Sequence, residues 1–281
     1  MDMQEVKMKR IKTSAVVLIL IITTLILASC GNDSGESSWE RVQKEGVLKV
    51  GTEGAWAPFI YNDQNNNNKL VGFEVEWAEA IADELGVDIK WDVSSQWDGV
   101  IAGLDAERYD CVFCAVAPTD YSADKYTFSD PYYVMKTVLV TAADRNDIKT
   151  IEDLKGKIVG TSPQGVWGLM ATEAGADVRN MNLTEAANNL ATGRIDATLN
   201  SELAILDYMK TSGDDKIKIA SYYEPEDPNE ELIVALFNNG NDELVEHVNA
   251  AIEKTIKSGK ASELSIKYFG KDIYEGVDFY E

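Results

Sequence analysis

Residues 70–86 read LVGFEVEWAEAIADELG, and the segment Val87–Trp91 that follows alternates apolar and polar residues. Apolar residues recur every fourth position over Trp77–Leu85, which predicts an amphipathic helix that ends at Gly86. We expect strands on both sides of this helix, at Leu70–Val75 and at Val87–Trp91. Such strand–helix–strand units build sheets that are mainly parallel and covered by helices.

The same alternation of elements continues along the rest of the chain. We predict further strands at 47–50, 111–116, 138–140, 157–159, 197–199 and 233–237. We predict further helices at 97–104, 151–154, 165–174, 183–190, 202–208, 243–256 and 262–268. Ligands of open α/β sheets bind beyond the carboxyl ends of the strands, so residues directly after strands are the candidates for a site.

The composition excludes some functions. The 281 residues are enough for about two domains. The chain has 48 Asp and Glu against 26 Lys and Arg, and this net charge of −22 argues against nucleic acid as a partner. A single histidine and three cysteines argue against a histidine-built metal site and a Ser-His-Asp triad. We therefore expect no metal and no cofactor.

The first thirty residues have the pattern of an export signal. Four cations at Lys7–Lys12 precede an uncharged apolar run at 15–28. This run is shorter than the roughly 20 residues of a membrane span, but it fits the apolar part of a signal peptide. It ends in Leu-Ala-Ser-Cys at 27–30, which resembles the bacterial lipobox, whose cysteine becomes the lipidated first residue.

We therefore expect a lipoprotein signal peptide at 1–29 and a lipid on Cys30. Small polar residues follow, and they predict a flexible tether over 30–42. The protein would then lie on the extracytoplasmic face of the bacterial cell membrane, held there by its lipid. An uncleaved signal anchor with a chance cysteine is the alternative.

The other two cysteines, Cys111 and Cys114, form a CxxC pair in the run YDCVFCAVAP. A redox or metal pair is one interpretation. The run has the pattern of a buried strand, however, and positions i and i+3 of a strand face opposite sides. The sequence contains no second cysteine pair to complete a zinc site. We predict two buried, reduced thiols.

Six blocks of the sequence occur in the order typical of one family. They are GTEGAWAPF at 51–59, LVGFEVEWAEAIADELG at 70–86, FSDPYY at 128–133, EDLKGKIVG at 152–160, GRIDATLNSELA at 193–204 and VNAAIEKTIKSGKASELSIKYFG at 248–270. In these blocks the chain resembles the bacterial extracellular solute-binding protein family 3. These are receptors for polar amino acids and cystine that serve ABC transporters.

The resemblance implies an α/β, two-lobed periplasmic-binding-protein-like fold of type II. Each lobe would hold a mixed, mainly parallel sheet flanked by helices. Lobe 1 would comprise 43–134 plus 233–281, lobe 2 would comprise 135–232, and two hinge segments would let the lobes close on a ligand. Such a protein captures a solute and delivers it to an ABC transporter permease. We expect a monomer that is not an enzyme.

Candidate ligand-binding residues follow the first strand. These are Glu53, Trp56 and Phe59, together with Trp97 at the start of a later helix. In the family, the positions matching Trp56 and Trp97 wall the side-chain pocket. An aromatic wall suits a flat or cationic ligand through stacking or cation–π contact. The alternative is that these rings belong to the core.

The loop after the strand at 111–116 binds the ligand's head group in the family. Here it offers Cys114, Ala115, Ala117 and Thr119. Three residues after the Thr, the family places an Arg that clamps the ligand's α-carboxylate through a bidentate pair. The matching position in this chain is Ser122.

The second anchor of the family also differs. The Asp that pairs with the α-ammonium group is Ser201 in this chain, with Glu202 next to it. The helix start that offers a hydroxyl to the carboxylate consists here of Gln164, Gly165, Val166 and Trp167. It keeps backbone N–H groups but has no hydroxyl.

Both charges that hold a zwitterionic head group are therefore replaced. A buried carboxylate without a cation costs several kcal/mol. We hypothesise that the ligand is not a standard α-amino acid but a neutral or cationic amine or aromatic or heterocyclic solute. Trp56, Trp97 and Trp167 would contact it, with Glu53 or Glu202 as the counter-charge.

Three alternatives stay open. An ordinary amino-acid or cystine receptor is possible if Lys136 or backbone amides hold the carboxylate. A dehydratase-like enzyme on the same fold needs a general acid or base in the cleft, for which Glu53 and Glu202 are the candidates. A sensory module that presents its ligand to a membrane kinase would need a partner protein.

One further pattern resembles a calcium loop. Asp63, Asn65, Asn67 and Glu74 have the spacing of EF-hand ligands. The sixth position lacks the expected glycine, and Glu74 falls inside the strand predicted at 70–75. We expect an asparagine-rich turn between two strands rather than a calcium site.

Overall fold

The computed structural model describes residues 36–118, 125–213, 215–277 and 279–280. Its contacts divide the chain into Met1–Ser37 and Ser38–Glu281, and every helix and strand named below lies in the second unit. Residues 1–29 and Cys30, for which we predict a signal peptide and a lipid, lie outside the described residues. Among the described residues, no helix is both long enough and apolar enough to cross a membrane.

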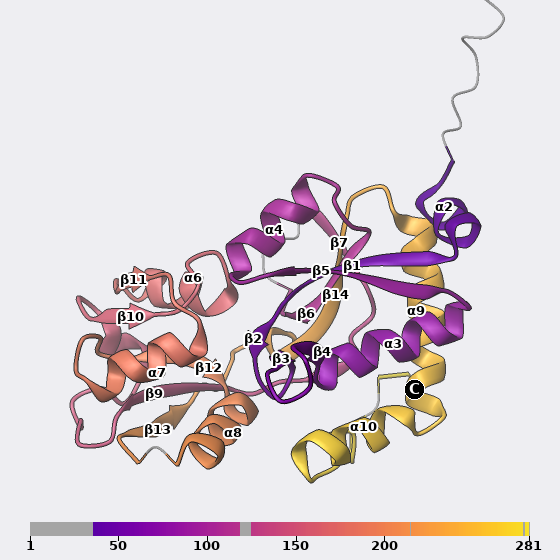
Figure 1. The fold of residues 1–281 in the computed structure, drawn as a ribbon. Coiled ribbons are helices and arrows are strands. Elements are labelled where there is room, and N and C mark those ends of the chain that lie inside the picture. The colour runs from indigo at the N-terminus through magenta and orange to yellow at the C-terminus, as the bar shows by residue number, and fades with distance from the viewer. Residues whose placement is uncertain (1–35, 119–124, 214, 278, 281) are drawn as a thin grey trace, which may run out of the picture. The chain divides into compact units, whose positions relative to one another are not determined.

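Lobe 1 is built on the larger sheet, whose strand order is β5-β1-β6-β14-β7, with β8 paired to β14 (Figure 1). Its strands are β1 (Val47–Glu53), β5 (Asp88–Ser94), β6 (Cys111–Val116), β7 (Tyr126–Phe128), β8 (Tyr133–Val134) and β14 (Leu232–Asn238). β1 runs parallel to β5 and β6, whereas β14 is antiparallel to β6, β7 and β8. The sheet is therefore mixed.

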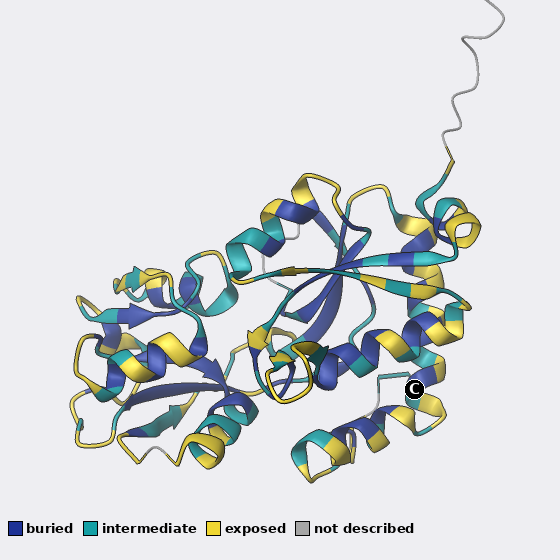
Figure 2. Ribbon diagram, in the orientation of Figure 1, coloured by how far each residue is buried: buried dark blue, intermediate teal, exposed yellow. Residues whose placement is uncertain are grey.

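Helices cover this sheet with their apolar faces. They are α2 (Ser38–Glu45), α3 (Phe73–Leu85), α4 (Trp97–Asp105) and α9 (Asp242–Lys257), while α10 (Lys260–Phe269) packs on α3 and α9. The predicted period of α3 is confirmed, because Trp77, Ala78, Ile81 and Ala82 are all buried (Figure 2). A small sheet of β2 (Ala55–Trp56), β3 (Ile60–Asp63) and β4 (Lys69–Val71) lies beside α3.

Lobe 2 is smaller. Its strands are β9 (Thr137–Ala142), β10 (Ile158–Gly160), β11 (Asp177–Arg179), β12 (Thr198–Ser201) and β13 (Ile217–Tyr222). The order β12-β9-β13 is antiparallel, whereas β10 pairs in parallel with β11. Its helices are α6 (Val166–Glu173), α7 (Leu183–Ala191) and α8 (Glu202–Ser212), with the 3-10 turns η1 (Ile151–Leu154) and η2 (Pro228–Glu231). The two-lobed α/β fold is thus confirmed.

The chain passes between the lobes twice, from β8 to β9 and from β13 to β14. These passages lie near the predicted lobe limits, and the exact limits stay a prediction. Cys111 and Cys114 are buried free thiols on β6, as predicted.

Two predictions about local structure are wrong. The strand expected at Leu70–Val75 ends at Val71, and α3 begins at Phe73. The break is at Gly72, whose φ is +137° and whose Cα approaches the backbone so closely that a Cβ would lie 2.2 Å from the Phe59 carbonyl oxygen. Only glycine fits such a turn.

The predicted tether at 30–42 extends too far, because Ser38–Glu45 forms α2. Trp39 and Val42 of this helix are buried, and the Trp39 ring stacks on His247 of α9 at 4.0 Å between ring centroids. The polar composition of the segment does not show this anchoring, since it depends on α9.

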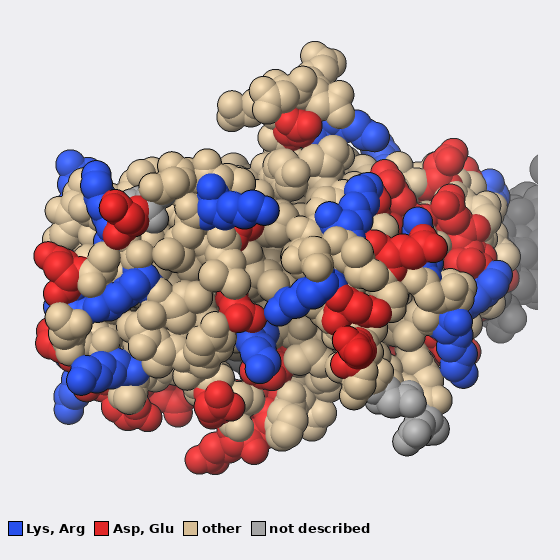
Figure 3. Space-filling model, turned by 90° about the horizontal axis from the view of Figure 1, so that it is seen from below, with Lys and Arg blue, Asp and Glu red and all other residues tan. Residues whose placement is uncertain are grey.

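Acidic and basic side chains are interspersed on the face shown in Figure 3. Many of the cations are neutralised by direct ion pairs. Lys267 Nζ, for example, lies 2.7 Å from Glu76 Oε2, and Lys125 Nζ lies 2.7 Å from Asp105 Oδ2.

Candidate functional site

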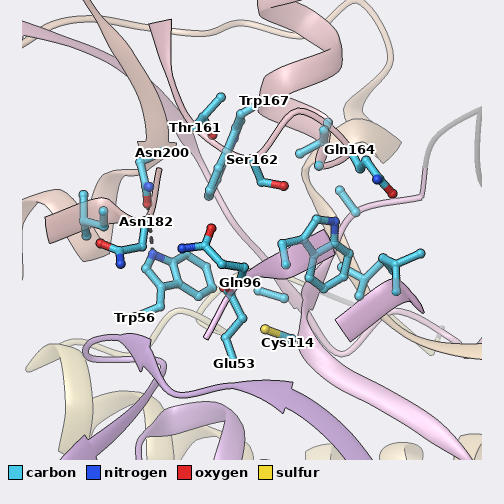
Figure 4. A pocket seen from close by; sticks show the side chains of 18 of the residues that line it. Glu53, Trp56, Gln96, Cys114, Thr161, Ser162, Gln164, Trp167, Asn182 and Asn200 are labelled. Atoms are coloured by element: carbon cyan, nitrogen blue, oxygen red, sulfur yellow. Dashed lines mark hydrogen bonds between the residues drawn. The ribbon is translucent and has the colours of Figure 1, made fainter. Parts of the chain in front are cut away.

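A pocket lies between the two lobes, at the ends of strands from both (Figure 4). Lobe 1 contributes the residues after β1, the start of α4 and the end of β6. Lobe 2 contributes the loop between β10 and α6, the start of α7 and the end of β12. The position agrees with the rule that ligands bind beyond the carboxyl ends of strands.

Ten of the residues predicted from the sequence line this pocket. They are Glu53, Trp56, Trp97, Cys114, Ala115, Ala117, Gln164, Gly165, Val166 and Trp167. The structure thus brings together residues that are more than a hundred positions apart in the chain. That they bind a ligand remains a prediction.

Three predicted residues do not line the pocket. Phe59 is fully buried and stacks behind Trp56 with 4.5 Å between ring centroids, so its ring belongs to the core. Ser201 is fully buried at the end of β12. Glu202 accepts a hydrogen bond of 2.8 Å from the Tyr222 hydroxyl. Thr119 and Ser122 lie outside the described residues.

The error at Ser201 has a simple cause. Successive side chains of a strand point to opposite faces, and the neighbouring Asn200 is the one that reaches the pocket. Asn200 Oδ1 also accepts a hydrogen bond from the backbone N–H of Ser201. Placing the site one residue earlier would have found it.

Twelve other lining residues were missed by the sequence reasoning. They are Ala55, Gln96, Ile101, Val116, Tyr126, Thr161, Ser162, Met181, Asn182, Leu183, Asn200 and Leu236. Thr161 and Ser162 could have been found from the sequence, because they directly follow β10 and a strand was predicted there. Asn182 caps α7 and accepts a hydrogen bond of 2.9 Å from the Glu185 N–H.

Tryptophan rings form much of the wall. Trp56 is 7% exposed, and its Nε1–H donates to Asn200 Oδ1 at 3.0 Å, from lobe 1 to lobe 2. Trp167 lies edge-on to Trp56 at 5.9 Å between centroids and donates to Thr137 Oγ1 at 3.0 Å. Trp97 is half-buried, and its Nε1–H has no hydrogen-bond partner among the described residues.

Asp98 makes two further hydrogen bonds between the lobes. Its Oδ1 accepts from Ser162 Oγ at 2.8 Å, and its Oδ2 accepts from Asn180 Nδ2 at 3.3 Å. With the Trp56–Asn200 bond, these contacts hold the start of α4 and the hairpin of β2 against lobe 2. The pocket is therefore enclosed by polar contacts as well as by aromatic rings.

Glu53 is the one carboxylate among the described lining residues, and none of those residues is Lys or Arg. Burial raises the pKa of Glu53 to about 7, and the negative charge of Asp98 adds to the rise. The backbone N–H of Trp97 opposes it by hydrogen bonding to the carboxyl. Near neutral pH, Glu53 therefore exists in both protonation states.

The residues with EF-hand spacing, Asp63, Asn65, Asn67 and Glu74, do not form one loop. β3 and β4 make an antiparallel hairpin around the Asp63–Asn68 turn, in which Asp63 Oδ1 accepts a 2.9 Å hydrogen bond from the Asn65 N–H. Glu74 lies on α3, not in a strand, and its carboxyl is buried against Tyr132 and Tyr133.

Sequence comparison agrees with this geometry. The family model of bacterial extracellular solute-binding proteins, family 3, matches residues 48–271. The chain belongs to this family. Its members are receptors of ABC transporters, so the protein is an extracytoplasmic solute receptor for an ABC importer.

Individual relatives are similar to this chain along most of their length. The L-cystine-binding protein TcyA of Bacillus subtilis is 37% identical over 272 residues, which are 93% of this chain and 99% of the relative. An ancestral arginine-binding protein bound to arginine is 33% identical, with a TM-score of 0.72 over 80% of this chain and 99% of that one.

The L-cystine solute receptor of Neisseria gonorrhoeae in its unliganded open conformation gives a lower TM-score. It is 36% identical over 83% of this chain and 97% of that one, yet the TM-score is 0.54. The higher score with the arginine-bound structure fits the hydrogen bonds that join the two lobes here.

Proposed function

We propose that this receptor binds a small neutral or cationic solute without an α-carboxylate, such as an amine or an aromatic heterocycle. The observation that supports it most is the charge of the pocket. Its described lining offers one carboxylate, Glu53, and no cation. A ligand carboxylate placed there would be desolvated beside a negative group, which is unfavourable.

The aromatic wall supports the same class of ligand. Trp56, Trp97 and Trp167 present ring faces or edges that stack on a flat solute or attract a cation. The Nε1–H of Trp97, which has no partner in the described part of the chain, and the side chains of Thr161, Ser162 and Gln164 can supply hydrogen bonds that fix its orientation.

An ordinary amino-acid or cystine receptor is the second candidate, because a relative at 37% identity is named an L-cystine-binding protein. In that case backbone N–H groups at Val166 and Trp167, in the first turn of α6, together with Thr161 and Ser162, would hold the α-carboxylate. Lys136 does not serve this purpose, since it is exposed and does not line the pocket.

The dehydratase-like alternative loses one of its two candidate acids. Glu202 lies outside the pocket, which leaves Glu53 as the one carboxylate of the described lining for general acid or base catalysis. Turnover of any ligand, followed by proton NMR, distinguishes an enzyme from a receptor.

A thermal-shift screen tests the ligand class. The purified domain from residue 31 onward is heated with L-amino acids, L-cystine, aromatic amines, purines and pyrimidines at pH 8. A ligand that binds only the folded state raises Tm by mass action. We expect shifts with amines or heterocycles. A shift with α-amino acids alone would show that the second candidate is correct.

Calorimetry with any ligand found in the screen shows whether the ligand carries a positive or a negative charge near Glu53. A cation needs ionised Glu53, so its affinity should fall as the pH drops below about 7. A ligand carboxylate would show the opposite trend. The Glu53→Gln variant should abolish the trend in both cases.

We also infer that Cys30 carries the lipid that holds the receptor at the membrane. The lipobox-like sequence and the preceding apolar run support this inference. Metabolic labelling with an alkyne-tagged fatty acid should mark the wild-type protein and not the Cys30→Ser variant. Labelling of both proteins would exclude Cys30 as the acylated residue.

A further inference from the structure

The wall of the pocket contains a strained residue. Ala115 lines the pocket and has a φ of +49°, in the left-handed region. Residues with a Cβ rarely adopt this conformation, and it persists only where the surroundings impose it. The other non-glycine residues of positive φ, within the described part of the chain, are Asn67, Asn68 and Glu107, none of which lines the pocket.

The strain coincides with an irregularity in the sheet. Val116 of β6 pairs with Val234 of β14, and Val112 pairs with Leu236, so residues 113–115 face the single residue Ala235. Such bulges bend a strand and re-aim its side chains. The β14 side is satisfied, because the Ala235 N–H donates to Ser129 Oγ at 2.8 Å and the Ser129 N–H donates to the Ala235 carbonyl at 2.9 Å.

On the β6 side, a buried glutamate that does not line the pocket interacts with the backbone at the bulge. Glu74, in the first turn of α3, is completely buried. Its Oε2 accepts from the Tyr132 hydroxyl at 2.8 Å and its Oε1 from the Tyr133 hydroxyl at 2.6 Å. The backbone N–H of Ala115 also lies close enough to this carboxyl to oppose the rise of its pKa.

Burying this carboxyl group in the core is energetically unfavourable. No Lys or Arg pairs with Glu74 among its described partners, and burial raises its pKa to about 7. An apolar side chain would fill the same space without desolvating a charge. The three donors that meet at the carboxyl explain its presence, because they tie the bulge to α3 and to the Tyr132–Tyr133 segment.

We propose that Glu74 is a positioning residue that holds Ala115 in its left-handed conformation and so sets the shape of the pocket wall between Cys114 and Ala117. The inference rests on the proposed ligand site, but its test observes Ala115 directly and needs no ligand. A failed ligand screen therefore leaves this test intact.

Ionisation of Glu74 should change the strength of its interaction with the Ala115 backbone. An ionised carboxylate accepts from both hydroxyls and attracts the Ala115 N–H, whereas a protonated one must also donate its own proton. Tyr132, Tyr133, Tyr274 and Cys114 also face Glu74, and the pKa of each is raised well above its usual value, so they stay neutral near pH 7. Glu53 interacts electrostatically with Cys114 and titrates in the same range, so it must be controlled.

NMR of the alanine-labelled domain tests the proposal. The Ala115 signals are assigned by their loss in Ala115→Gly. In the wild type we expect the Ala115 amide shift to titrate with a midpoint near pH 7, and the same titration to persist in Glu53→Gln. In Glu74→Gln we expect the titration to vanish and the Ala115 13Cα and 13Cβ shifts to leave their left-handed values. Ala117, in the same wall, is the internal control.

The proposal would be overturned by an Ala115 shift that is independent of pH in the wild type, or that titrates only while Glu53 is present. Unchanged Ala115 carbon shifts in Glu74→Gln would also overturn it. Should Glu74→Gln not fold, the wild-type and Glu53→Gln titrations decide the question. Tyr133→Phe, which removes one donor to the carboxyl, should then displace the midpoint.

Discussion

Replacing Glu53 by glutamine should stabilise the receptor at pH 8, and much less at pH 5. The pKa of this carboxyl is 4.5 in an ordinary environment and about 7 in the folded protein. The folded state therefore binds the proton more tightly than the unfolded chain does. Stability falls as the pH rises from about 4.5 to about 7, and the whole penalty is present above pH 7.

The size of the effect follows from this difference in pKa. A rise from 4.5 to about 7 corresponds to about 3 kcal/mol. That is an upper bound, because Glu53 is only half-buried in the pocket wall and solvent screens part of its charge. At about 2–4 °C per kcal/mol, the Tm of the variant should exceed that of the wild type by several degrees at pH 8.

Thermal unfolding by circular dichroism between pH 5 and pH 8.5, at constant ionic strength, measures this difference. Glu246→Gln, at an exposed site on α9, is the matched control and should change Tm little at any pH. Glu74 titrates in the same range but is present in every variant, so it cancels from the comparison. A Glu53→Gln protein that is no more stable than the wild type at pH 8 would refute the reasoning.

Three further predictions concern the pocket and its frame. For a cationic ligand, affinity at pH 6 should be several-fold lower than at pH 8, because ionised Glu53 is required; calorimetry at both pH values checks this. Asn200→Ala removes the acceptor of the Trp56 Nε1–H across the lobes, and it should weaken binding by roughly fivefold in a titration of tryptophan fluorescence. Asn182→Ala removes the N-cap of α7 and should lower stability by about 1 kcal/mol in urea unfolding, whereas Asn188→Ala, on the same helix, should not.

Local patterns predicted most of the elements correctly. The helix at Trp77–Leu85 and the buried strand at Cys111–Val116 depend on side chains spaced along one element, and that spacing is visible in the sequence. The break at Gly72 and the helix at Ser38–Glu45 were missed because they depend on contacts with Phe59 and α9, which are distant in the chain.

The site was predicted to a similar extent. Residues at or beyond the ends of strands, such as Glu53 and Gln164, line the pocket because parallel strands end at one edge of the sheet. Asn200 was confused with Ser201 because the sequence does not show which face of β12 is turned toward the pocket. Met181 and Leu183 follow β11, a strand of three residues that is too short to show a period.

The sequence by itself determined the family, the two-lobed α/β class and most of the loops that form the pocket, because these depend on periodicity and on motifs in a set order. Only the tertiary structure decided the pKa values of the two glutamates at and beneath the pocket wall. Glu53 and Glu74 each lie within three residues of a glycine and look alike in the sequence, but one lines the pocket and the other lies beneath its wall. The pKa of a carboxyl is set by the solvent, charges and donors that folding brings around it, and none of these is a property of the residue alone.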